Sequence, residues 1–157
     1  MHATQLAKLS HEAAIHALDL QERGVEQLRA RTGTLLAASS LTASFLGAQA
    51  IRRGSSIGTL AAFALVALAC SIVLCIYVLL PKSDFVFEIS PSRMYESLFE
   101  VAEDESEVHR HLAYWLEDFW RANQAKIDIL GRYFLVAAMA LILQLAFWSW
   151  ALAASIS

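Results

Sequence analysis

The side chains best suited to chemistry lie in a polar stretch that covers residues 82–132. Aromatic residues and cations are interleaved along its predicted helices, and they are Tyr95, Tyr114, Trp115 and Trp120 with Arg93, Arg110, Arg121 and Lys126. Aromatic faces stack on nucleobases, and a guanidinium group holds a phosphate through two parallel hydrogen bonds. The mixture therefore favours a nucleotide pocket. The same aromatic residues would equally seal one helix against another.

The remaining residues do not indicate catalysis or a metal centre. The sequence has no glycine-rich phosphate loop, no nucleophile elbow and no cysteine cluster. His11 and His16 are one residue too far apart for both imidazoles to reach one metal from a single helix face. His109 and His111 are two residues apart and therefore point to different sides of a helix. We therefore expect a protein that is not an enzyme and has no cofactor or metal.

The apolar residues that surround this stretch indicate a membrane protein. Of the 157 residues, 57% are hydrophobic and 17% are charged, whereas soluble domains average roughly 45–50% and 25%. No Lys, Arg, Asp or Glu occurs in 32–51, 54–81 or 133–157. Apolar runs of about 18 residues or more are typical of membrane spans. The predicted fold class is an all-α membrane protein with three transmembrane helices, at 32–51, 57–80 and 133–157, the first two forming a hairpin over 32–81.

Two polar segments complete the predicted architecture. Residues 1–31 form a cytoplasmic amphipathic helix that runs directly into the first span, with a possible bend at Gly24. Its apolar residues form two neighbouring stripes, one of Leu6, Leu9, Ala13 and Leu20 and one of Leu18, Val25 and Leu28. Residues 82–132 form a helical cytoplasmic insert that opens with an extended stretch. A helix then starts at Pro91 behind an N-cap at Ser90, and a last helix continues into the third span.

The basic residues set the predicted orientation. Ten of the twelve Lys and Arg residues lie in the N-terminal helix and the insert, and only Arg52 and Arg53 lie on the other side. The positive-inside rule then places the chain in the inner membrane, with the N-terminus and the insert cytoplasmic and the C-terminus outside. Trp148 and Trp150 are expected near the far interface and Tyr133 near the close one. The net charge of −3 argues against a nucleic-acid partner.

Small and polar residues within the spans predict helix contacts. A stripe at helical spacing in the first span consists of Gly33, Ala37, Ser40, Ser44 and Gly47. Such a stripe lets another helix approach closely, so we expect it to pack within the chain, or to serve as a subunit contact or pore lining in a homo-oligomer. Gln144 lies midway along the third span and needs a hydrogen-bond partner in lipid. Ser40, Thr42 or Ser44 can supply that partner.

The order of these elements resembles a known family. A small-residue span (RARTGTLLAASSLTASFLGAQA) is followed by a leucine-rich exit (IYVLLPK), an alternating stretch (FVFEI) and a tyrosine-bearing helix (SRMYESLFE). A basic and aromatic junction (QAKIDILGRYFLVAA) then leads into the last span. This layout resembles the small membrane effectors of bacterial Pycsar antiphage systems, over the chain from about residue 28 to its end.

The resemblance implies a function. A partner cyclase would make cyclic CMP or cyclic UMP after infection, and the effector would sense it and disrupt the inner membrane, so that infection is aborted. The candidate ligand-binding residues, from the resemblance and from the aromatic and cationic pattern together, are Arg93, Tyr95, Trp115, Arg121, Lys126 and Arg132. The alternative is a constitutive small membrane scaffold or assembly subunit that binds a protein partner through the insert. An ion channel gated by voltage or pH is less favoured, because the spans hold no charged residue.

Overall fold

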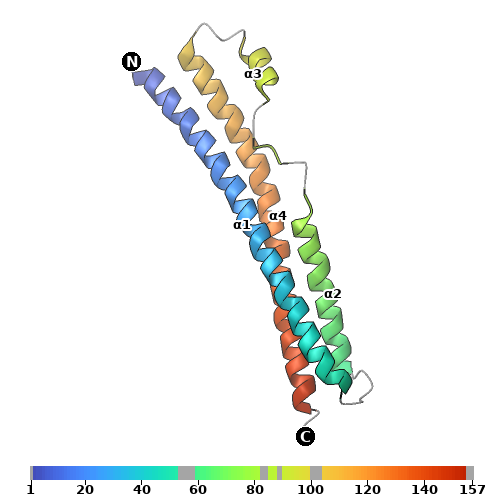
Figure 1. Ribbon diagram of the computed structural model, residues 1–157. Helices are drawn as coiled ribbons and strands as arrows, with labels where there is room; N and C mark the ends of the chain where they lie inside the picture. Colours follow the sequence, from blue (N-terminus) through green and yellow to red (C-terminus); the bar gives the residue numbers. More distant parts are fainter. Residues whose placement is uncertain (1, 53–58, 82–84, 88–89, 100–103, 155–157) are drawn as a thin grey trace. The chain divides into compact units, whose positions relative to one another are not determined.

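The computed structural model describes residues 2–52, 59–81, 85–87, 90–99 and 104–154, of which 94% are helical and none forms a strand. The helices are α1 (His2–Arg52), α2 (Thr59–Leu79), α3 (Pro91–Leu98) and α4 (Glu105–Ala154), as Figure 1 shows. The all-helical class predicted from the sequence is confirmed.

Two of the helices are unusually long. α1 has 51 residues and α4 has 50. Each joins a polar segment to an apolar one without interruption, as the sequence predicts. The bend considered at Gly24 does not break the helix, which continues through this residue. A glycine costs a helix about 1 kcal/mol relative to alanine, and this local cost is too small to end a helix that is held on both sides.

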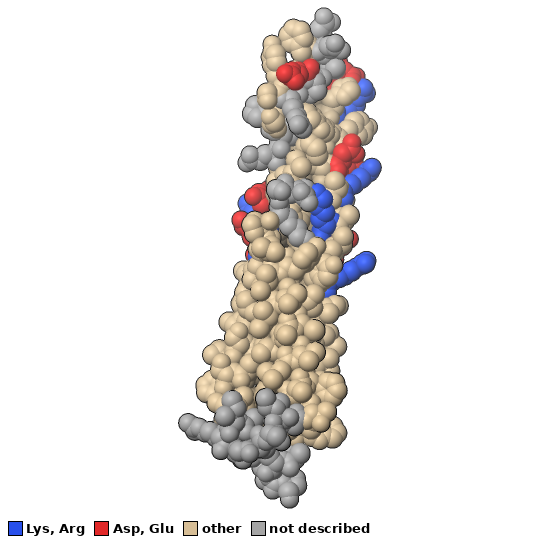
Figure 2. Space-filling model, turned by 90° about the vertical axis from the view of Figure 1, so that its right-hand side faces the viewer, with Lys and Arg blue, Asp and Glu red and all other residues tan. Residues whose placement is uncertain are grey.

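The chain divides into two compact units. The polar unit consists of Met1–Glu26 and Lys82–Asp128, and the apolar unit of Gln27–Pro81 and Ile129–Ser157. All 15 Asp and Glu residues belong to the polar unit. The charged residues of the apolar unit are all arginines, namely Arg29, Arg31, Arg52, Arg53 and Arg132. On the face drawn in Figure 2, charged side chains gather over one part and a long stretch carries none.

Within the apolar unit, α2 runs antiparallel to α4. The rings of Phe63 and Phe147 stack with centroids 5.7 Å apart, and those of Tyr77 and Tyr133 meet edge to face at 4.6 Å. A buried cluster of Ala61, Ala64 and Trp148 lies beside the first of these pairs. Trp148 is therefore a packing residue and not a member of an exposed aromatic belt, since the alanines of α2 leave room for its indole.

The apolar unit carries its large apolar side chains outward. Those exposed include Leu41, Phe45, Val66, Val73, Leu135, Ile142 and Trp150. The polar residues Thr32, Ser39, Ser71 and Gln144 are fully buried in the same unit. Water would favour the opposite distribution, whereas lipid as the surrounding solvent favours this one.

Two of the described helices are long and apolar enough to cross a membrane. They are α2 over Thr59–Leu79 and the apolar part of α4, within Glu105–Ala153. The described part of the predicted span at 32–51 does not meet this criterion. Its threonines, serines and glycines lower its mean hydropathy, so the span predicted at 32–51 is not established by the fold.

In the polar unit, α1 and α4 run parallel. Leu18 and Val25 of α1 are buried, as are Leu112 and Leu116 of α4. Only one of the two apolar stripes predicted on α1 is used, because Leu6, Leu9 and Leu20 of the other stripe stay more than half exposed. The amphipathic character expected of this helix is thus only partly realised within the chain.

The two helices of the insert begin differently. Ser90 is the N-cap of α3 and Pro91 follows at its first position, as predicted, but the Ser90 side chain makes no capping hydrogen bond. The Ser90 carbonyl accepts from the Met94 amide at 3.0 Å. Asp104 caps α4, because its Oδ1 accepts from the Ser106 amide at 2.9 Å. The predicted extended stretch is non-helical over 85–87, and its last two residues lie outside the described residues.

Candidate functional site in the polar unit

A groove lies between α1 and α4 in the polar unit. Its volume is about 580 Å³, within the range of roughly 300–1,000 Å³ that small-molecule pockets occupy. The lining residues from α1 are Leu6, Ala7, Ser10, Ala14 and Ala17, and those from α4 are Ser106, Arg110, Ala113, Tyr114, Leu116, Glu117 and Trp120. The groove therefore lies within one unit and between two parallel helices.

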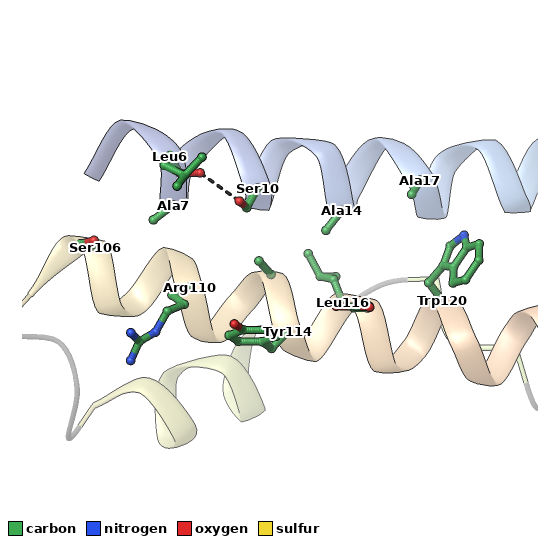
Figure 3. Close-up of a pocket in the computed structure, with 12 residues that line it drawn as sticks. Leu6, Ala7, Ser10, Ala14, Ala17, Ser106, Arg110, Tyr114, Leu116 and Trp120 are labelled. Carbon is green, nitrogen blue, oxygen red and sulfur yellow. Dashed lines mark hydrogen bonds between the residues drawn. The ribbon is translucent and has the colours of Figure 1, made fainter. Parts of the chain in front are cut away.

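The groove exists because small residues recur along α1 where it faces α4. Ala7, Ala14 and Ala17 occupy this side of α1. Ala113 is a lining residue from α4. In Figure 3, Leu116 and Trp120 reach from α4 toward α1. Arg110 and Tyr114 extend from α4 on the side away from α1, at the edge of the space. The result is an apolar floor with an aromatic and cationic rim.

The charges at the rim are paired along α4. Arg110 forms an ion pair with Glu107, and Arg121 forms one with Glu117 at 2.6 Å. Both pairs are solvent-exposed, and exposed pairs of this kind are worth only about 0–1 kcal/mol. An anionic ligand can therefore draw the Arg110 guanidinium from Glu107 at little cost. Tyr114 and Trp120 are 63% and 37% exposed, so part of each side chain is accessible to a ligand.

Two imidazoles meet beside the groove. The Nδ1 atoms of His11 on α1 and His109 on α4 lie 3.0 Å apart, and the ring centroids are 5.2 Å apart. Burial and the neighbouring His109 lower the pKa of His11, and Glu12 partly offsets this. Glu105 Oε1 lies 3.7 Å from Nε2 of His109. Among the described residues, no group of three or more potential ligands that could hold a metal is present here or elsewhere.

Gln21 joins the same two helices farther along. Its Nε2 donates to the backbone carbonyl of Trp120 at 3.1 Å and to Oε1 of Gln124 at 3.0 Å. The first of these bonds fixes α1 against the backbone of a groove residue. The buried Oε1 of Gln21 has no partner among the described atoms. Gln21 and the histidine pair therefore fasten α1 to α4 at two levels, the histidines alongside the groove and Gln21 beyond Ala17.

Asn123 holds the entry segment of the insert. Its Oδ1 accepts from the Val86 amide at 3.2 Å and its Nδ2 donates to the Val86 carbonyl at 2.8 Å, while Asn123 itself is almost fully buried. The side chain thus provides the non-helical stretch with the backbone pairing that a neighbouring strand would otherwise supply. Next to it, the Lys126 ammonium lies 5.7 Å from the centre of the Phe85 ring.

The structure does not gather the predicted ligand-binding residues into one place. Tyr95 is exposed on α3 beside Phe99, with ring centroids 5.6 Å apart, and Trp115 packs on Phe119 at 5.7 Å. Lys126 covers the Phe85 ring. The six predicted residues are Arg93, Tyr95, Trp115, Arg121, Lys126 and Arg132. None of them is among the described residues that line the groove. The Arg93 side chain lies outside the described residues.

The two remaining members of that set have other surroundings. Arg121 is exposed and paired with Glu117, which does line the groove. Arg132 belongs to the apolar unit and is exposed there. The groove instead uses Arg110, Tyr114 and Trp120, which the sequence pattern contains but does not single out.

The polar residues of the apolar unit form a buried seam. Gln144 Nε2 donates to the Ser39 carbonyl at 3.2 Å. The hydroxyls of Ser39 and Ser71 lie 3.4 Å apart, and that of Ser71 donates to the Ala137 carbonyl at 3.3 Å. The first span does supply the partner of Gln144, as predicted, but the acceptor is the Ser39 backbone. The hydroxyls of Ser40 and Ser44 instead donate to the α1 carbonyls four residues earlier.

The predicted small-residue stripe faces outward in the single chain. Ala37, Ser40 and Ser44 are exposed. A Cβ atom added at Gly33 or Gly47 would meet nothing within 4 Å. The stripe therefore does not serve packing among the described residues of the chain, and its face is open to lipid or to another molecule.

Sequence reasoning missed the contacts that join α1 to α4. His11 with His109 and Gln21 with Gln124 are separated by about 100 residues in the chain, and spacing within one helix cannot reveal them. The signal that was present is the alanine spacing at positions 7, 14 and 17 on α1. Comparison with protein-family models, with curated proteins and with solved structures finds no match to this chain.

Proposed function

We propose that this chain is an antiphage membrane effector that binds a cyclic pyrimidine mononucleotide in the groove of its polar unit and disrupts the inner membrane in response. The observation that carries the proposal is the groove itself, which combines an apolar floor with Arg110, Tyr114 and Trp120 at its edge. A cyclic mononucleotide needs a cation for its phosphodiester and an aromatic face for its base.

The apolar unit supports the membrane half of the proposal. It has an apolar exterior and a polar interior, and two of the helices are long and apolar enough to span a bilayer. We propose that α1, α2 and α4 all cross the inner membrane, with the polar unit cytoplasmic and the chain assembled as a homo-oligomer. Ten of the twelve Lys and Arg residues lie in 1–31 and 82–132, and this unequal distribution of cations between the two sides supports the orientation.

Ligand binding would act through α4. This helix carries the rim of the groove at Arg110, Tyr114 and Trp120 and continues without a break to Ala154. A population shift from 1:99 to 99:1 requires about 5.5 kcal/mol of preference for the active state. One stacked base contributes about 1–3 kcal/mol, and hydrogen bonds to charged groups about 1.5–3 kcal/mol each. A few sites in an oligomer are therefore sufficient.

The test is calorimetry on detergent-purified full-length protein, with cyclic CMP, cyclic UMP and cyclic AMP titrated in turn. We expect saturable binding of a pyrimidine form and dye leakage from liposomes that contain the protein and this nucleotide. In Arg110→Gln the affinity should fall at least tenfold. Arg121→Gln is the matched control, because Arg121 is also exposed and paired on α4 but does not line the groove.

The absence of heat with any of the three nucleotides, on protein shown to be folded and assembled, would contradict the proposal. So would liposomes that stay sealed when nucleotide is bound. Equal losses in Arg110→Gln and Arg121→Gln would place the ligand outside the groove.

A second candidate function is a constitutive membrane scaffold that binds a protein partner through the insert. The observation that favours it is the exposed aromatic pair of Tyr95 on α3 and Phe99 at the C-cap of this helix, with Met94 exposed as well. Exposed aromatic residues of this kind are enriched at protein interfaces. If Tyr95→Ala abolishes recovery of a defined partner while nucleotides produce no heat, the scaffold replaces the effector.

A further inference from the structure

The contact between His11 and His109 depends on the number of protons that the two rings hold. A hydrogen bond between two Nδ1 atoms requires a proton on one of them and a lone pair on the other. The observed separation of 3.0 Å fits one such bond. Two neutral rings can form it, and so can one neutral and one charged ring.

The first added proton preserves the contact. Glu105 lies 3.7 Å from Nε2 of His109, so a proton on this nitrogen gains an opposite charge. His109 then carries protons on both nitrogens and donates from Nδ1 to the lone pair of His11. The hydrogen bond becomes charge-assisted and stronger.

The second proton abolishes the contact. It must bind to Nδ1 of His11, which is the atom that accepts the hydrogen bond. Both Nδ1 atoms would then carry hydrogen, and two positive rings would face each other at 3.0 Å. The lowered pKa of His11, caused by burial and by His109, is the expected sign of this conflict.

The charged groups that face the pair come from both helices. Glu12 on α1 acts on His11 and favours its charged form, but less strongly than burial and His109 oppose it. On α4 the charged neighbour of His109 is Glu105. Glu96 on α3 forms no ion pair or hydrogen bond with either ring among the described contacts. Among the described contacts, the protonation of the pair therefore depends on the two imidazoles and on Glu12 and Glu105.

We propose that His11 and His109 form a proton-operated latch that holds α1 against α4 at neutral pH and releases α1 in acid. The latch lies beside the groove, since Ser10 and Arg110 are the chain neighbours of the two histidines and both line it. After release, the hydrogen bonds of Gln21 would be the side-chain hydrogen bonds that remain, among those described, between α1 and α4 in the polar unit. This proposal does not rest on the identity of the groove's ligand.

The test measures the separation of α1 and α4 directly. Spin labels are attached to cysteines introduced at the exposed positions Ile15 and Asp118, in full-length protein whose Cys70 and Cys75 are replaced by alanine. Electron–electron resonance distances are recorded in lipid nanodiscs at pH 8.0, 6.5 and 5.0. We expect a short distance at the two higher pH values and a second, longer population at the lowest.

The variants separate the latch from general acid effects. In His11→Asn the amide oxygen can still accept from His109 but does not titrate, so the short distance should persist at the lowest pH. His16→Asn and His111→Asn are matched controls, because these histidines are exposed on the same two helices; both should open as the parent does. Circular dichroism at each pH monitors helix content. An unchanged distance in the parent, or opening of His11→Asn in acid with helix content retained, would overturn the proposal.

Discussion

The side-chain nitrogen of Gln144 on α4 lies 3.2 Å from the backbone oxygen of Ser39 on α1, and both residues are fully buried in the apolar unit. The bond joins the two long helices at the level where the Ser39 and Ser71 hydroxyls also meet. The Oε1 atom of Gln144 has no partner among the described atoms. Of the two polar atoms of the amide, only Nε2 therefore has a hydrogen-bond partner among the described atoms. Substitutions at Gln144 should show whether this donor contributes to stability.

The first prediction concerns the donor at this position. Gln144→Leu should lower the free energy of unfolding by only about 1 kcal/mol, because hydrogen bonds between membrane helices are worth roughly that much. Gln144→Glu keeps the shape but places an acceptor against the Ser39 carbonyl, and the cost should be clearly larger at neutral pH. Unfolding in bicelles provides the measurement.

The pH dependence of Gln144→Glu gives an internal control. Burial disfavours the charged form of an introduced carboxyl, and its protonated form would fit the site and donate to Ser39. The variant should be most stable in acid and lose stability as the pH rises above the ordinary range of a glutamate. Equal stability of the Leu and Glu variants at every pH would show that the hydrogen bond is unimportant.

The second prediction concerns Asn123, which pairs with both backbone groups of Val86. Asn123→Ala leaves these groups without their partner and should cost about 1–3 kcal/mol. Hydrogen exchange of the Val86 amide should become much faster. Asp118→Ala, an exposed change on the same helix, should leave both quantities unaltered. Slow exchange at Val86 in Asn123→Ala would show that other contacts hold the segment.

The sequence and the structure agree where a single element decides the outcome. The span predicted at 57–80 agrees with α2 (Thr59–Leu79) to within two residues at each end, and Ser90 with Pro91 predicts the start of α3. The candidate site could not be predicted in this way, because it depends on which face of α1 meets α4. Leu6 and Leu18 are equally apolar in sequence, yet only Leu18 is buried. Alanines at the helix contact, and not the exposed cations, create the groove.

The third prediction follows from the lowered pKa of His11. The unfolded chain takes up a proton at this histidine near pH 6.5, the ordinary value, whereas the folded chain resists it. The unfolded state therefore binds more protons just below pH 6.5, so the free energy of unfolding should fall as the pH falls through this range. Thermal unfolding of the parent and of His11→Asn, recorded between pH 8 and 5, should show the parent losing stability relative to the variant as the pH falls. A constant difference between the two proteins across this range would contradict the assignment.

The fourth prediction concerns Trp120 at the rim of the groove. Trp120→Ala should weaken nucleotide binding about tenfold, or about 1.4 kcal/mol, because a base stacked on an aromatic ring contributes about 1–3 kcal/mol. Trp150→Ala removes an exposed indole from the apolar unit and should leave the affinity unchanged. Calorimetry on both variants gives the comparison. Unaltered binding in Trp120→Ala would place the base against another surface.

The last prediction tests the outward stripe of the apolar unit. Because a Cβ at Gly33 meets open space, Gly33→Ala should not perturb the fold of a single chain and should favour the helix by up to about 1 kcal/mol. Ser44→Leu likewise changes only an exposed position. If the stripe is the contact between copies in a homo-oligomer, the bulky leucine should prevent close approach and shift the protein to smaller species. Mass photometry in nanodiscs and liposome leakage should then change together. An oligomer that survives Ser44→Leu with unchanged size would assign the stripe to lipid.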